Sequence, residues 1–263
     1  METPLLMVDK VAKYYTTPGT RNQQFCVFED VSLTVREKEF VAVLGHSGCG
    51  KSTLLNIIAG IDTASDGHIF LDGREIRGAG LDRMVVFQNF ALMPWLTVYG
   101  NIRLAVRAAN PGWTKDEVAE HVRRYVEMVG LSGAENKKPS ALSGGMRQRV
   151  GLARAFSVNP RIMLLDEPFA QIDALTRGVI QDELVRMWTE TGITLFMVTH
   201  DVEEAILLSD RVLLMSPGPG AQIAEEIKVN LPRPRERAEL IDDPRYYKLR
   251  EKIVGFLSMK HAA

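Results

Sequence analysis

The sequence predicts an α/β protein whose sheet is mainly parallel. Phe40–Leu44 and the last four residues of Arg161–Leu165 are continuous apolar runs, as expected for strands that are buried on both faces. Stretches with helical spacing of apolar residues separate these and other short strand-like runs. Strands that alternate with helices are typical of parallel sheets, in which ligands bind at the carboxyl ends of the strands. The residues directly after each strand are therefore the first candidates for function.

Length, charge and cysteine content narrow the class of protein. A chain of 263 residues suits one large α/β domain, or one domain with an inserted lobe. The net charge of −1 gives no electrostatic reason to expect nucleic acid as a partner. Two cysteines are too few for a disulfide framework, so we expect a reducing compartment. No apolar run reaches about 18 residues, and the N-terminus lacks the features of a signal peptide, so we expect a soluble or membrane-peripheral protein.

The N-terminal segment predicts strands before and after the central turn. Leu5–Tyr15 predicts a first strand, and the polar stretch Thr16–Gln24 predicts a loop. Val27–Val35 alternates apolar and polar residues, which is the pattern of a half-buried strand. Two Asp-Gly turns bracket a short strand at Gly67–Leu71.

A glycine-rich turn joins the strand Phe40–Leu44 to the apolar helix Leu54–Ala59. It reads Gly-x-x-x-x-Gly-Lys-Ser, so pattern and context match a phosphate-binding P-loop. The backbone N–H groups and the positive end of the helix can face one anion. Lys51 can reach the β- and γ-phosphates, and the Ser52 hydroxyl can ligate Mg²⁺. The helix N-terminus could lower the pKa of the Cys49 thiol, although a tolerated variable position is the simpler interpretation. The candidate nucleotide-binding residues of this turn are Gly45, His46, Ser47, Gly48, Cys49, Gly50, Lys51, Ser52 and Thr53.

Helical patterns dominate the middle of the chain. Thr97 to about Val129 has helical spacing, with a capping box at Thr114–Glu117 and a break at Asn110–Gly112. We expect a helical lobe at about 90–160, carried on a single domain over 5–230 and followed by a short C-terminal extension over 231–263. Further helices are expected at Val150–Phe156, Leu175–Glu190 and Arg245–Leu257, and a further strand at Ile193–Val198.

Four polar residues follow predicted strands at the edge where a ligand would bind. Asp166 follows four apolar residues and is suited to hold Mg²⁺, while Glu167 is placed to orient or deprotonate a water. The pair could instead cap a helix. Gln88 follows Met84–Phe87, and His200 follows the strand that ends near Val198. Each of these two residues alone is a weak signal.

Taken together, the motifs resemble the ATP-binding-cassette (ABC) ATPase subunits, and the resemblance covers nearly the whole chain. The P-loop, Gln88, Leu142-Ser143-Gly144-Gly145-Met146, Leu164-Leu165-Asp166-Glu167-Pro168, Asp173 and His200 come in the order seen in that family. The resemblance implies a P-loop NTPase core with a mainly parallel sheet, an N-terminal antiparallel part and an inserted helical lobe. It also implies ATP hydrolysis coupled to transmembrane transport, with ATP and Mg²⁺ as cofactors.

The resemblance assigns a role to each matching residue. Tyr15 is similar to the aromatic residue that stacks on adenine. Gln88 would contact the metal and the attacking water and relay to the membrane partner, beside Ser52 and Asp166 as metal ligands. Glu167 would be the general base and His200 would sense the γ-phosphate. The signature residues Ser143, Gly144 and Gly145 would close over the γ-phosphate of a partner subunit, so that ATP is sandwiched between two chains.

Two positions depart from the widespread family pattern. The fifth signature residue is Met146, where glutamine is usual, and Ala170–Ile172 precedes Asp173, where Ser- or Gly-Ala-Leu is usual. Neither segment supplies a catalytic group, so the departures bear on coupling across the dimer and leave the hydrolysis residues unaffected.

A narrower resemblance points to importers of small anions. The segments Val86–Asn89, Leu92–Ile102, Leu142–Arg149 and Asp173–Arg177 look like the subgroup for nitrate, nitrite, cyanate, taurine, alkanesulfonates and bicarbonate, and Leu231–Arg235 leans toward the nitrate and cyanate branch. This resemblance implies permease subunits, a second identical or paralogous ATPase subunit, and indirectly a periplasmic or lipoprotein solute-binding protein. It implies no nucleic acid, and a peripheral place on the cytoplasmic side of the inner membrane.

Alternatives remain at this point. The chain could serve a taurine, alkanesulfonate or bicarbonate importer. It could also be a soluble ATPase clamp without a transport role, or a relative of exporters. The segment Met93–Trp95 could grip a membrane subunit or pack locally in the helical lobe.

Overall fold

The computed structural model describes residues 3–16 and 24–259, and these fall into two compact units. Unit 1 combines the N-terminal part up to residue 79 with the part from residue 196 onward. Unit 2 is the continuous stretch 80–195. Most of the expected loop at Thr16–Gln24 lies outside the described residues, as does the very end of the C-terminal extension.

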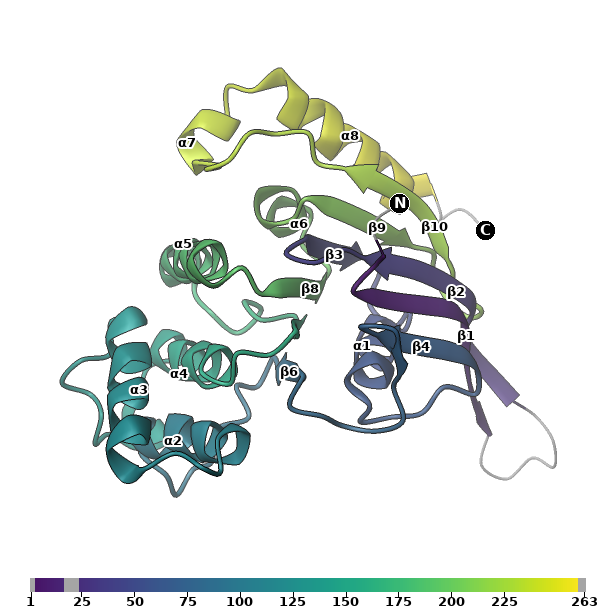
Figure 1. The fold of residues 1–263 in the computed structure, drawn as a ribbon. Helices are drawn as coiled ribbons and strands as arrows, with labels where there is room; N and C mark the ends of the chain where they lie inside the picture. Colours follow the sequence, from purple (N-terminus) through teal and green to yellow (C-terminus); the bar gives the residue numbers. More distant parts are fainter. Residues whose placement is uncertain (1–2, 17–23, 260–263) are drawn as a thin grey trace. The chain divides into compact units, whose positions relative to one another are not determined.

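Unit 1 contains an antiparallel sheet formed early in the chain. The strand β1 (Leu6–Thr16) lies between β2 (Gln24–Val35) and β4 (Asp66–Leu71) (Figure 1). The strand β5 (Arg74–Glu75) pairs with β4 and forms the edge. Alternate residues of β2 are buried in its second half, as the period-2 pattern predicts. This sheet is the N-terminal antiparallel part that the family resemblance implies.

A second group of strands in unit 1 carries the P-loop. The strand β3 (Phe40–Leu44) pairs in parallel with β9 (Arg211–Met215), and all ten of their residues are buried. The strand β10 (Ile223–Lys228) pairs with β9 antiparallel. The helices of this unit are α1 (Lys51–Ala59), α6 (Val202–Leu208), α7 (Arg237–Leu240) and α8 (Pro244–Met259).

Unit 2 is mostly helical. Its strands β6 (Arg83–Val86) and β7 (Ile162–Asp166) pair in parallel. The helix α4 packs against the helices before and after it and against β6. The helices are α2 (Val98–Ala109), α3 (Lys115–Met128), α4 (Gly144–Phe156) and α5 (Ala174–Thr191), with a 3₁₀ turn at Pro139–Ala141. The buried strand β8 (Thr194–Thr199) crosses the boundary between the two units.

The observed elements confirm most of the sequence predictions, extend one expected helix and add an edge strand. The capping box is present: the Thr114 hydroxyl accepts from the Glu117 N–H at 3.2 Å, and the Glu117 carboxylate accepts from the Thr114 N–H at 2.7 Å. The helix α4 contains the expected helical stretch Val150–Phe156 and begins earlier, at Gly144, because Ser143 caps it despite two glycines in the first turn. The edge strand β10 was not predicted, because only Ile227 of its six residues is buried.

None of the helices in the described ranges is long and apolar enough to span a membrane.

Candidate nucleotide-binding and hydrolysis site

The P-loop of unit 1 closes around the ammonium group of Lys51. This side chain is 4% exposed, and its Nζ donates to the carbonyls of Gly45 at 2.8 Å and His46 at 2.9 Å. Lys51 is the first residue of α1, so its charge lies where the positive helix end also points. A buried positive charge beside a helix N-terminus favours the binding of an anion, because both attract negative charge.

Glycine is required at two positions of this loop. Gly50 has φ 99°, and a Cβ there would lie 2.7 Å from Val27 Cγ1 and 2.8 Å from Phe28 Cδ1. Gly45 has ordinary φ, but a Cβ would lie 2.9 Å from the Met215 carbonyl oxygen. The backbone of the loop is therefore pressed against β2 and the end of β9, and any side chain at these positions would displace it.

Two side chains of the loop have contacts that the sequence did not reveal. Cys49 is buried, and that burial raises the pKa of its thiol, which outweighs the opposite effect of Lys51. The suggestion of a lowered thiol pKa was therefore wrong, because desolvation exceeds the attraction of the nearby charge. His46 bonds through Nε2 to the carbonyl oxygen of Leu257 in α8 at 2.9 Å, which brings the C-terminal extension against the loop.

Tyr15, the predicted adenine-stacking residue, is fixed by two neighbours. Its ring is 46% exposed, and its hydroxyl donates to the Asp62 carboxylate at 3.1 Å. Lys13 pairs with the same carboxylate at 2.7 Å and lies 4.9 Å from the centre of the Tyr15 ring. Lys13 lowers the pKa of Asp62 by a hydrogen bond. Sequence reasoning missed Lys13 and Asp62, because they lie 49 residues apart and share no local motif.

His200 is exposed and lies between two fixed elements. It follows the last residue of β8, Thr199, and precedes Asp201, the N-cap of α6. The Asp201 carboxylate accepts from the N–H groups of Glu203 and Glu204 at 2.9 and 3.1 Å. The Thr199 hydroxyl bonds the Glu204 carboxylate at 2.9 Å and accepts from the Asp201 N–H at 3.0 Å. The backbone around the histidine is thus held on both sides while its ring faces solvent.

In unit 2, Asp166 and Glu167 occupy the end of β7, as predicted. Asp166 is the last residue of the strand, and both acids are half-buried. Glu167 has φ 43°, a left-handed conformation that costs a non-glycine residue about 1–2 kcal/mol. Strain of this kind persists where the surroundings fix the backbone, and it is common at functional sites. The Glu167 carbonyl accepts from the Ala170 N–H at 3.2 Å, so a turn follows directly.

Gln88 lies in an exposed turn after β6, and side chains of α4 fix the segment that follows it. Phe90 and Ala91 both have positive φ, 63° and 42°. The Arg154 guanidinium of α4 donates to the carbonyls of Ala91 at 2.8 Å and Phe90 at 3.3 Å, and Arg147 lies over the Phe90 ring. Sequence reasoning missed Arg154, because an arginine between alanines in a helix is an ordinary surface pattern.

The signature segment presents a capped helix end to solvent. Ser143 is exposed, and its Oγ accepts from the Met146 N–H at 3.2 Å. Gly145 is buried, and a Cβ there would lie 2.4 Å from Thr176 Cγ2 in α5. Gly144 lies near the Gln171 carbonyl, with 3.5 Å to the position of a Cβ. The departure at Met146 leaves the helix cap intact, because the residue uses only its backbone N–H there.

The segment Met93–Trp95 is exposed at its tip and pinned at its base. Trp95 is 67% exposed, so local packing in the helical lobe does not account for it. Asn101 is fully buried in α2 and holds the segment: its Oδ1 accepts from the Met93 N–H at 2.8 Å, and its Nδ2 donates to the Thr97 carbonyl at 3.0 Å. A polar residue on the buried face of a helix was the signal that could have identified Asn101.

The site residues divide between the two units. Tyr15, the P-loop and His200 belong to unit 1, whereas Gln88, Asp166, Glu167 and the signature segment belong to unit 2. Within the described parts of the chain, no three His, Cys, Asp or Glu side chains gather into a site for a metal ion. The donors expected for Mg²⁺ are a hydroxyl, an amide and one carboxylate. This set fits Mg²⁺, which is commonly held by one or two carboxylates together with substrate phosphates and waters.

The fold and the loop around Lys51 define a P-loop nucleotide-binding protein. A family profile described as ABC transporter matches residues 28–170, more than half of the chain. The chain therefore belongs to the ABC transporter family of ATP-binding proteins, and it is an ATPase of that family.

Close relatives cover the chain almost completely. It is 47% identical over 98% of its length to the bicarbonate transport ATP-binding protein CmpD of Synechococcus elongatus, and covers 92% of that protein. It is 45% identical over its whole length to the nitrate import ATP-binding protein NrtD of the same organism, covering 94% of it. The longer nitrate import protein NrtC is 48% identical, but the chain covers only 39% of it.

Solved structures resemble the chain as a whole. A dimeric structure of MJ0796, a bacterial ABC transporter cassette, has a TM-score of 0.76, 31% identity, and coverage of 86% of this chain and 99% of that one. The post-hydrolysis dimer of the same cassette, bound to ADP and phosphate, has a TM-score of 0.75 at 31% identity.

Proposed function

We propose that this chain is the ATP-hydrolysing subunit of a membrane importer for a small inorganic anion, with nitrate, nitrite or cyanate as the transported class. The observation that carries the proposal is similarity over nearly the full length to nitrate and bicarbonate import ATP-binding proteins. The membrane permease moves the solute, and this subunit supplies the energy.

Nucleotide binding falls to unit 1 in this proposal. Tyr15 stacks on adenine, with its ring orientation supported by the bond to Asp62. The loop from Gly45 to Thr53 holds the phosphates, with the Lys51 charge at its centre. Mg²⁺, when bound, neutralises charge that develops on the phosphates, and Ser52, Gln88 and Asp166 are the residues proposed to hold it.

Hydrolysis adds residues of unit 2. Glu167 acts as the general base toward the attacking water, and Gln88 orients that water. His200 contacts the γ-phosphate. The left-handed backbone at Glu167 and the Arg154 contacts beyond Gln88 support this assignment, because both fix carbonyl and side-chain directions before ATP arrives.

Two copies, or this chain and a paralogue, complete the site. Ser143, Gly144 and Gly145 of one subunit close over the γ-phosphate held by the other subunit. ATP then contacts both subunits only in the closed dimer, so it favours closure by the free energy of those extra contacts. Hydrolysis removes the contacts and the dimer reopens. The dimeric cassettes among the structural relatives support this arrangement.

The exposed segment around Trp95 is the proposed contact with the permease, and the cytoplasmic face of the inner membrane is the proposed location of the subunit. Leu104 of α2 is also exposed and apolar. Trp95→Ser is expected to reduce co-purification with the permease from detergent, with ATP binding retained. Ile61→Ser is the matched control, because Ile61 is similarly exposed but belongs to unit 1.

The transported solute is the least constrained part of the proposal. Nitrate and bicarbonate are both monovalent anions with three oxygens on a planar centre, and the bicarbonate and nitrate relatives are 47% and 45% identical to the chain. Uptake of labelled nitrate, cyanate, bicarbonate and taurine by cells with and without this chain decides among them. Uptake of nitrate that depends on the chain is the expected result, and dependence of bicarbonate or taurine uptake alone would contradict the nitrate proposal.

A soluble ATPase clamp acting on nucleic acid or another protein is the rival function. The net charge of −1 and the exposed Trp95 favour the transport role over this rival. Purification of the chain without any permease, from cells in which uptake is unaffected by its loss, would favour the rival.

A further inference from the structure

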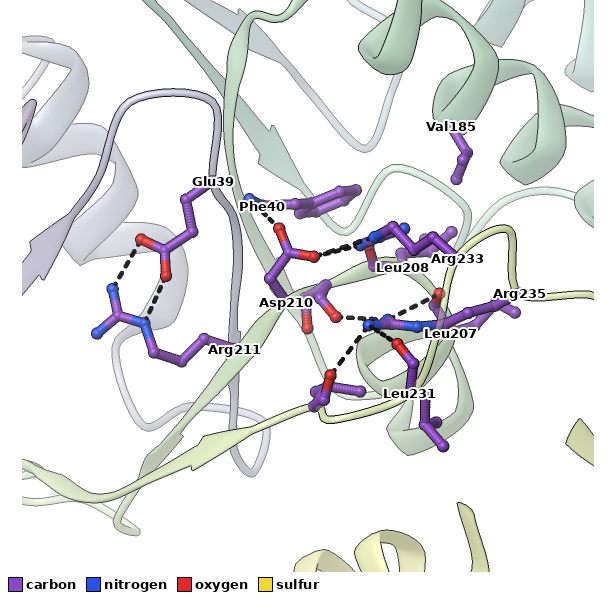
Figure 2. Close-up of polar contacts among 12 residues, drawn as sticks. Glu39, Phe40, Val185, Leu207, Leu208, Asp210, Arg211, Leu231, Arg233 and Arg235 are labelled. Atoms are coloured by element: carbon purple, nitrogen blue, oxygen red, sulfur yellow. Dashed lines mark hydrogen bonds and ion pairs between the residues drawn. The ribbon is translucent and has the colours of Figure 1, made fainter. Parts of the chain in front are cut away.

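Arg235, in the C-terminal extension, donates from both terminal nitrogens of its guanidinium to backbone oxygens of unit 1. Its Nη1 donates to the carbonyls of Ile206 at 2.8 Å, Leu207 at 3.2 Å and Ser209 at 2.6 Å (Figure 2). Its Nη2 donates to the carbonyls of Val229 and Leu231 at 3.2 and 3.4 Å. Burial, together with the neighbouring Arg233 charge, lowers the pKa of Arg235 to about 10, so the guanidinium stays charged at neutral pH.

These contacts close the C-terminal end of α6. The last four carbonyls of a helix receive no hydrogen bond from within the helix, so they need other donors. Besides the two bonded by Arg235, the Ala205 carbonyl accepts from Ser209 Oγ at 2.6 Å, and the Leu208 carbonyl accepts from Arg233 Nη2 at 2.6 Å. A positive charge at this end also matches the helix dipole. Two arginines of the extension therefore hold a helix of only two turns.

The same extension is tied to the strand that leads into the P-loop. Arg233 pairs with Asp210 Oδ1 at 2.8 Å, and Asp210 Oδ2 accepts from the Phe40 N–H at 3.0 Å (Figure 2). Phe40 is the first residue of β3, five residues before Gly45. A movement of the extension would therefore act on β3 and on α6 together.

The other end of α6 carries the residue proposed to contact the γ-phosphate. His200 directly precedes the N-cap Asp201, and α6 has only seven residues. The helix α8 adds a contact near this end, where Arg250 donates to Glu203 at 2.6 Å. The position of the His200 backbone thus depends on how α6 is held at both ends.

We propose that Arg235 is a positioning residue for ATP hydrolysis, which acts through α6 on His200 and makes the C-terminal extension a brace of the nucleotide site. The inference rests on the proposed role of His200.

A double-mutant cycle on the assembled transporter tests this proposal. Arg235→Lys keeps the charge but removes the planar fork that reaches five carbonyls, and it is expected to lower kcat for ATP about tenfold. KM for ATP is expected to stay within about twofold. In a His200→Ala background the same change is expected to have no further effect on kcat, because the residue through which it acts is gone. Arg245→Lys is the matched control, since Arg245 pairs with the neighbouring Asp243 and its side chain is exposed.

Rates are normalised to the number of sites that bind a fluorescent ATP analogue, so that loss of folded protein does not count as loss of kcat. Effects of Arg235→Lys and His200→Ala that multiply would overturn the proposal, as would an unchanged kcat per binding site in Arg235→Lys. If His200→Ala alone keeps the wild-type kcat, the proposed role of His200 fails, and the brace fails with it. If His200→Ala lowers kcat but the effects of the two substitutions multiply, the role of Arg235 is refuted and the role of His200 stands.

Discussion

Two helix N-termini with glycines before or in their first turn are proposed to carry the nucleotide chemistry, and they are built in opposite ways. At the P-loop, α1 starts after Gly50, the loop is packed on β2 and β9, and the Lys51 ammonium is buried inside it. At the signature segment, α4 starts after the exposed Ser143, whose own hydroxyl caps the helix. The first is a loop with its own buried cation, while the second is a helix end that an exposed serine caps.

The difference teaches which site can act alone. A glycine-rich loop with a buried cation can bind a polyphosphate without residues from a second chain. A solvent-facing helix end gains energy from an anion only when another surface brings the anion to it and excludes water. Binding should therefore depend on the P-loop alone, whereas hydrolysis should depend on both sites.

The largest effect is expected from removing the general base, which stops the chemical step but leaves the P-loop and the signature segment intact. Glu167→Gln is expected to lower ATP turnover about 10²–10⁴-fold, because the general base is lost. ATP binding is retained, and the ATP-bound dimer accumulates because the contacts that favour closure are never released. Turnover and gel-filtration size in ATP are the measurements. Normal turnover would show that Glu167 is not the base.

Replacing the buried Lys51 tests the P-loop. Lys51→Ala is expected to weaken ATP binding at least about 100-fold, since charge-assisted bonds to the phosphates are lost. Titration of the purified chain with a fluorescent ATP analogue measures this. Micromolar affinity in the variant would contradict the phosphate-cradle interpretation. The thermal midpoint serves as the control for folding, because Lys51 also bonds two carbonyls of its own loop.

The signature site should behave in the opposite way. Ser143→Arg places a bulky charge on an exposed helix end, so the free chain is expected to keep its ATP affinity within about twofold. Turnover is expected to fall about 100-fold, because the donors that close over the γ-phosphate are blocked. Calorimetry of ATP binding and a steady-state ATPase assay separate the two quantities. A matching loss of ATP affinity would place the signature in the chain's own binding site.

The smallest effect concerns the support of the P-loop from α8. A chain ending at Phe256 lacks the Leu257 carbonyl that bonds His46, and is expected to raise KM for ATP about two- to fivefold. A chain ending at Met259 keeps that carbonyl and is the control. Equal KM values for the two truncated chains would exclude a role for this bond.

The sequence predicts a feature well when the residues that determine it are close together in the chain. The P-loop, the capping box at Thr114 and the strand before Asp166 are each written in a few consecutive residues, and the structure confirms their elements. The edge strand β10 could not be predicted, because its sequence Ile-Ala-Glu-Glu-Ile-Lys does not alternate apolar and polar residues.

Contacts between distant residues were also beyond local reasoning. Lys13 and Asp62 support Tyr15 across 49 residues, and Arg235 reaches α6 across nearly 30. Their partners are carboxylates and backbone carbonyls that only the fold brings near. The possible lowering of the Cys49 pKa fails for a related reason, because the burial that raises this pKa cannot be seen in a helix-terminus motif.

The central claim is that the P-loop of one subunit works with the signature segment of another. Lys51→Ala and Ser143→Arg chains, each inactive alone, are mixed so that dimers exchange, and ATP hydrolysis is measured. In a mixed dimer one site carries both defects and the other carries neither, so about a quarter of the wild-type rate is expected to return. If the mixture stays as inactive as either variant alone, each P-loop is served by the signature of its own chain, and the account is wrong.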